Sequence, residues 1–68
     1  MKKFTRYYLT FEVLLRGTTS IIHMYSGIVR TPQKLLTWES IVFAAEGAWG
    51  KPIDREKLHL KIILLEEC

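Results

Sequence analysis

Among the residues of this 68-residue chain whose types suit acid–base or nucleophilic chemistry, two histidines, one threonine and one glutamate could lie near one another. His23 and His59 are far apart in the sequence, and Thr10 and Glu12 fall on the predicted strand that would lie between them in a sheet. A nucleophile and its base need hydrogen-bond contact and a pocket, and a flat three-stranded sheet offers little pocket. We therefore expect no enzyme and no small-molecule substrate.

Metal and disulfide chemistry are also not expected. The chain has one cysteine, Cys68, so no intrachain disulfide can form, and the two histidines and this cysteine are not spaced as a zinc site. We expect no cofactor. A chain this short buries only roughly 60% of its unfolded surface, and small scaffolds commonly gain stability from a partner. Self-association or a protein partner is therefore expected.

The charge balance gives only weak support for nucleic-acid binding. Ten Lys and Arg against seven Asp and Glu leave a net charge of +3, whereas nucleic-acid-binding domains usually concentrate more positive charge. No apolar run approaches the ~20 residues of a membrane span. The opening "MKK" resembles the start of a signal peptide, but Thr5, Arg6, Thr10 and Glu12 interrupt the apolar run after it. We expect a cytoplasmic protein without a membrane segment.

The first half of the chain alternates as two strands. Residues 4–15 place Tyr7, Leu9, Phe11, Val13 and Leu15 on one face, which predicts a strand. A second strand is expected over residues 18–29, after a two-residue turn at Arg16-Gly17. This turn would put Leu15 opposite Thr18 and Phe11 opposite Ile22, with Tyr8 opposite Tyr25 on the other face. Gly27 would end the regular pairing or mark a bulge.

A helix follows the two strands. Its apolar stripe has steps of three and four residues, which is the period of a helix. The stripe consists of Leu35, Trp38, Val42, Ala45 and Trp49. Two starts are open, Thr31 before Pro32 and Thr37 before "WESI", and we favour Thr37 for the main helix. Both tryptophans are expected in the core.

A third strand over residues 58–65 completes the chain. Leu58, Leu60, Ile62 and Leu64 would share one face. The fold class is therefore α+β, as one domain over residues 1–68. The elements follow one another in the chain as β-β-α-β and form two layers. One layer is a three-stranded antiparallel sheet of strand order 2-1-3, and the other is the helix on one of its faces.

The sheet face without a helix is the candidate binding surface, because a large apolar face left uncovered is usually a contact surface. Protein contact or dimerisation through it is the favoured function. Single-stranded nucleic acid is the alternative, with bases stacked on neighbouring tyrosines among basic residues. The candidate binding residues are Arg6, Tyr8, Thr10, Ile21, His23, Tyr25, Lys61 and Ile63.

Three segments carry a resemblance in layout to a known group. "MKKFTRYYLTFEV", then "TWESI" at the helix start, then "LHLKIILLEE" resemble the small β-β-α-β accessory proteins that phages and prophages encode. The resemblance implies a protein that acts in a bacterial or infected cell by binding a macromolecule, for example an anti-CRISPR inhibitor of a host defence. It implies no particular site residue.

Overall fold

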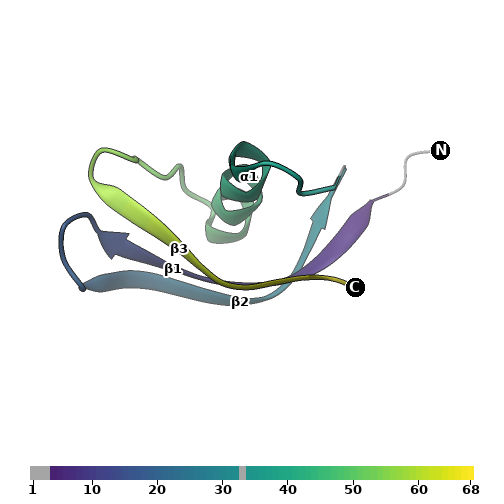
Figure 1. The fold of residues 1–68 in the computed structure, drawn as a ribbon, viewed down its shortest axis with the longest axis horizontal. Coiled ribbons are helices and arrows are strands. Elements are labelled where there is room, and N and C mark those ends of the chain that lie inside the picture. Colours follow the sequence, from purple (N-terminus) through teal and green to yellow (C-terminus); the bar gives the residue numbers. More distant parts are fainter. Residues whose placement is uncertain (1–3, 33) are drawn as a thin grey trace.

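The structure, a computed structural model, describes residues 4–32 and 34–68 as three strands and one helix (Figure 1). The elements are β1 (Thr5–Leu15), β2 (Ile21–Thr31), α1 (Trp38–Trp49) and β3 (Leu58–Glu67). β1 is the central strand and pairs antiparallel with both neighbours, which gives the order β2-β1-β3. Figure 1 shows α1 on one side of this sheet only. The predicted α+β fold class and strand order are confirmed.

The helix begins where the threonine cap predicted. Thr37 has an extended backbone, and its hydroxyl oxygen accepts a 3.1 Å hydrogen bond from the Ser40 amide. The Ser40 hydroxyl oxygen in turn accepts from the Thr37 amide, so two amides at the helix start have partners. At the other end Gly50 adopts the left-handed conformation, with φ of 82°, and its amide bonds the Glu46 carbonyl. Thr37, and not Thr31, is therefore the N-cap of α1.

The predicted register between the first two strands is wrong by three residues. Phe11 pairs with Tyr25 instead of Ile22, and Val13 pairs with His23. The connection is longer than two residues, because the Leu15 amide donates to the Ser20 carbonyl oxygen at 3.0 Å. The Thr18 hydroxyl and amide both donate to the Leu15 carbonyl oxygen and hold this wider loop. At Leu14–Ile21 the slip is two residues, and the extra residue Ile22 at the irregular step between Val13 and Leu14 makes it three from His23 onward. This odd slip turns the side chains of β2 from His23 onward to the face opposite to the predicted one, whereas Ile21 keeps its predicted face.

β3 also departs from simple alternation. Phe11 pairs with Ile62 and Thr10 with Leu64, so Ile63 is an extra residue in a β-bulge. The bulge turns the strand, and Leu65 lies opposite Leu9 on the side of the helix. The expectation that Leu64 shares a face with Leu60 is therefore wrong beyond the bulge.

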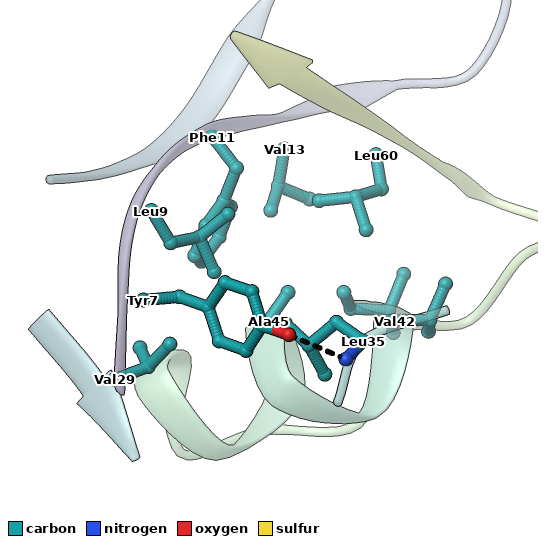
Figure 2. Packing of buried hydrophobic residues seen from close by; sticks show 10 residues of the cluster. Tyr7, Leu9, Phe11, Val13, Val29, Leu35, Val42, Ala45 and Leu60 are labelled. Carbon is teal, nitrogen blue, oxygen red and sulfur yellow. Dashed lines mark hydrogen bonds between the residues drawn. The ribbon is translucent and has the colours of Figure 1, made fainter. Parts of the chain in front are cut away.

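The core lies between α1 and the side of the sheet that faces it (Figure 2). Leu9, Phe11 and Val13 of the central strand are completely buried. The helix stripe contributes Val42 and Ala45 as predicted. The remaining buried hydrophobic residues are Tyr7, Val29, Leu35, Ile53 and Leu60.

The two tryptophans differ from one another. Trp49 is half-buried and packs against the core, as predicted. Trp38 is 48% exposed, so its assignment to the core is wrong. Trp38 is the first residue of α1, and it lines a small surface hollow together with Ile53 and Leu60.

Candidate functional site

The side of the sheet that α1 does not cover is the candidate site, and we call it the open face. Its members follow from the register, because partners in neighbouring strands share a face. Alternation along β1 places five residues on it: Arg6, Tyr8, Thr10, Glu12 and Leu14. Their partners add Met24, Ser26, Ile28 and Arg30 from β2 and His59, Lys61, Leu64 and Glu66 from β3.

Six of the eight predicted site residues are placed on or beside the open face. Arg6, Tyr8, Thr10 and Lys61 lie on it. Ile21 is the partner of Leu14 next to an irregular step in the pairing, and it is 47% exposed. Ile63 is the bulge residue of β3 and is 49% exposed.

The prediction that His23 and Tyr25 lie on the uncovered face is wrong, because both lie on the side of the helix. The Tyr25 ring stacks on Phe11, with 5.5 Å between the ring centroids. The His23 ring stacks on Trp49 at 5.2 Å. Tyr25 also lies against Gly27, where an added Cβ would meet the tyrosine hydroxyl oxygen at 3.1 Å. Gly27 therefore makes room for this ring, and the regular pairing continues past it to Arg30 and Thr31.

A hydrogen-bonded group of three hydroxyls lies at the middle of the open face. The Tyr8 hydroxyl is 2.8 Å from the Ser26 hydroxyl, and the Thr10 hydroxyl is 3.0 Å from the same atom. Thr10 and Ser26 are direct partners, and Tyr8 is one step along the same face of β1. These bonds restrain the tyrosine ring in the free protein. Less side-chain entropy is therefore lost when a partner binds against it.

Large apolar side chains surround these hydroxyls. Ile28, the partner of Tyr8, is 51% exposed, and Met24 is 63% exposed. Leu64 is exposed on the β3 side. Sequence reasoning missed Met24 and Ile28 because it predicted a shorter turn and a strand without the extra residue Ile22, which put both side chains against the helix. The run Thr18-Thr19-Ser20, which is typical of turns, was the available signal for a longer loop.

The charges on the open face are unevenly distributed. Arg6 and Arg30 are direct partners at one end of the sheet, and both are exposed. Further along, Glu12 lies opposite Lys61, which places opposite charges on neighbouring strands.

The residues considered for catalysis are not brought together. His23 pairs with Val13 on the side of the helix, whereas His59 pairs with Leu14 on the open face. The sheet therefore separates the two imidazoles, and no nucleophile–base pair forms between them. Within residues 4–32 and 34–68, no group of three His, Cys, Asp or Glu is placed to hold a metal ion.

A second hollow surface lies between α1 and β2. This groove has a volume of about 650 Å³, and its walls include Ile28, Val29 and Leu35. Phe43 stands on the helix side of the groove and is 72% exposed. β2 is an edge strand of the sheet that the structure describes, and its residues Ile28 and Arg30 border both this groove and the open face. The sequence analysis did not predict it.

One ion pair joins the first turn of α1 to the loop before β3. The Arg55 guanidinium donates to both carboxylate oxygens of Glu39, at 2.7 and 3.0 Å. The hydrogen bonds and then the positive charge of Arg55 hold the pKa of Glu39 below its ordinary value. Both groups are exposed, and the pair connects this loop to the helix.

Comparison of the chain with family models, curated proteins and solved structures finds no match in any of the three. In the part of the chain that the structure describes, no helix has the length and apolar character needed to cross a membrane.

Proposed function

We propose that this protein is a small, non-enzymatic binding protein that contacts another protein through its open face. The observation that carries the proposal is the exposure of Met24, Ile28 and Leu64 on one side of a sheet that the helix leaves uncovered. Apolar side chains grouped on one face are typical of an interaction surface. The polar Tyr8 and Ser26 among them resemble the mixed composition of protein interfaces.

The layout resemblance to phage accessory proteins leads to a finer proposal. The partner would then be a protein of a bacterial host, and binding would inhibit it. A second copy of this chain is the other protein partner that the open face can accept.

Single-stranded nucleic acid is less well supported by this geometry. Stacking of successive bases needs neighbouring aromatic rings beside basic groups. Tyr8 is on the open face, but Tyr25 and His23 lie on the side of the helix. Glu12 and Glu66 on the same face would repel a polyphosphate chain.

The experiment compares binding by surface variants that keep the fold. Ile28→Arg and Met24→Arg place a charge on the open face, and Leu36→Arg is the matched control because Leu36 is 82% exposed and lies outside the sheet. Sedimentation of the purified protein measures self-association, and affinity capture from a bacterial lysate measures a foreign partner. Both variants should lose the contact that the wild type and Leu36→Arg keep. Amide NMR spectra with unchanged dispersion would show that the fold is intact.

A different outcome would redirect the proposal. If Ile28→Arg and Met24→Arg keep full binding, the open face is not the contact surface. Loss of binding in Phe43→Arg alone would instead assign the contact to the groove between α1 and β2.

A further inference from the structure

Two arginines face each other across neighbouring strands at one end of the open face. Arg6 is the second residue of β1, and its direct partner on β2 is Arg30. Direct partners in an antiparallel pair have Cα atoms only about 4.5–5.5 Å apart. Both residues are exposed, and the register assigns both to the open face, where Arg30 also borders the groove between α1 and β2.

This arrangement costs stability in the free protein, because like charges directly opposite one another repel. Neither arginine is in an ion pair: within residues 4–32 and 34–68 the ion pairs are Lys34–Glu67 and Arg55–Glu39. Glu66, opposite Tyr8, and Cys68, whose amide donates to the Arg6 carbonyl oxygen at 2.8 Å, are neighbours of Arg6 on the β3 side, yet no ion pair joins either to it. The two arginines therefore form a local positive charge without an ion-pair partner in the described part of the chain.

The surroundings of the pair identify the kind of anion that fits. The next residues on the same face are Tyr8 and Ile28, which are direct partners and are 39% and 51% exposed. A ligand that fills this end of the face therefore needs apolar groups beside its negative charge. Glu66 is next to Tyr8, and its carboxylate disfavours a ligand with many negative charges in a row.

We propose that Arg6 and Arg30 form a carboxylate-binding site, and that the partner presents an acidic side chain there with apolar side chains against Tyr8 and Ile28. The inference rests on the proposed function and specifies the chemistry of its protein partner. Guanidinium groups bind carboxylates through paired hydrogen bonds, and two of them can enclose one carboxylate. Binding of the acidic group also removes the repulsion between the arginines, so this site is more favourable in the complex than in the free protein.

The test uses a blocked hexapeptide of alternating leucine and glutamate, and the matched peptide with glutamine in place of glutamate. Each is titrated into ¹⁵N-labelled protein at low and moderate salt, and amide shifts report where it binds. We expect the acidic peptide to shift the amides of Arg6, Tyr8, Ile28 and Arg30. The glutamine peptide should bind more weakly by about tenfold or more, because hydrogen bonds to a charged carboxylate are stronger than those to a neutral amide.

Variants separate this site from general attraction of charges. Arg6→Gln with Arg30→Gln should weaken binding of the acidic peptide about tenfold or more. Lys51→Gln with Lys57→Gln removes the same charge from exposed positions outside the open face, and it should leave that affinity nearly unchanged. Glu66→Gln should strengthen binding, because it removes a competing carboxylate.

The outcomes distinguish the failure of this inference from that of the proposed function. If the arginine variant binds the acidic peptide like the wild type, or if the two peptides bind equally at Tyr8 and Ile28, the carboxylate site is overturned while the open face stands. Shifts at Phe43, Ala44 and Gly47 on the helix side of the groove, without shifts at Arg6 and Tyr8, would overturn both. Tighter binding of a single-stranded oligothymidylate than of the acidic peptide at this end, at moderate salt, would show that the arginines prefer phosphate. It would overturn the carboxylate site. No shift with either peptide would overturn the carboxylate site.

Discussion

The hydroxyl oxygen of Tyr7 accepts a 2.9 Å hydrogen bond from the backbone amide of Leu35 (Figure 2). Tyr7 lies on β1, and Leu35 belongs to the segment that leads into α1. Both residues are buried, with 6% and 9% of their surface exposed. The bond crosses the core, and it fixes the approach to the helix relative to the central strand.

Tyr7→Phe removes the acceptor and leaves a buried amide without a partner. We expect the free energy of unfolding to fall by about 1–3 kcal/mol, the usual cost of an unsatisfied buried group. Urea denaturation followed by circular dichroism measures it. Tyr8→Phe is the control, because the Tyr8 hydroxyl bonds the exposed Ser26, and the loss of stability in this variant should be smaller. Equal losses in the two variants would contradict this role for Tyr7.

The pair Arg6–Arg30 leads to a prediction on stability. Arg30→Thr replaces the charge by a residue that suits strands, and the free energy of unfolding should rise by about 0.2–1 kcal/mol. Added salt screens repulsion, so it should stabilise the wild type more than this variant. Urea midpoints at two salt concentrations measure both effects. Lys57→Thr is the control with the same change of charge, and a rise of similar size there would argue against repulsion between the arginines.

His23 has a buried polar atom whose hydrogen-bonding capacity is not satisfied. Its Nε2 atom is buried and has no hydrogen-bond partner within residues 4–32 and 34–68. His23→Phe keeps a flat ring against Trp49 and removes the polar atom. We expect the free energy of unfolding to rise by about 1 kcal/mol in a thermal or urea melt. His59→Phe, on the exposed side of β3, should show no comparable gain. A lower stability of His23→Phe would show that the imidazole has a favourable role.

The ion pair between Glu39 and Arg55 makes part of the stability depend on pH. The pKa of Glu39 is lowered in the folded protein, first by its hydrogen bonds to Arg55 and then by the charge. This contribution is therefore present above the ordinary carboxyl pKa and is lost as the pH falls through the lowered value.

Glu39→Gln should thus be slightly less stable than the wild type near neutral pH, and the two should converge in acid. The effect is small because both groups are exposed. Thermal melts over a series of pH values measure it. Glu56→Gln changes an exposed carboxylate of the same loop whose side chain has no ion pair within residues 4–32 and 34–68. If its pH dependence matched that of Glu39→Gln, the ion pair would not be the cause.

Much of the architecture could be predicted from local patterns. The alternation of Tyr7, Leu9, Phe11 and Val13 defined the central strand, because one face of a strand must be buried and the period is two. Thr37 marked the helix start, because its hydroxyl supplies an acceptor that the first turn lacks. The strand order followed from the helix, which makes the third strand run parallel to the second and so lets it pair antiparallel with the first.

The composition of the open face depended on two features that local patterns do not contain. β2 has apolar or aromatic residues on both faces, so Ile22 and Met24 satisfied the predicted core as well as His23 and Tyr25 do in the structure. The stacking of Tyr25 on Phe11 and of His23 on Trp49 joins residues distant in the sequence, and only the packed structure shows it.

The sequence alone therefore determined the elements, their order and the β1 half of the open face, because these depend on local periodicity and capping. Tertiary structure decided the partners of β1. The wider loop at Thr18 and the extra residue Ile22 together set the register of β2, which placed Ile28 beside Tyr8 and Arg30 beside Arg6. The bulge at Ile63 reset the register of β3 and placed Leu64 beside Thr10. A two-residue period is satisfied equally by several registers, and only contacts across the whole core select one of them.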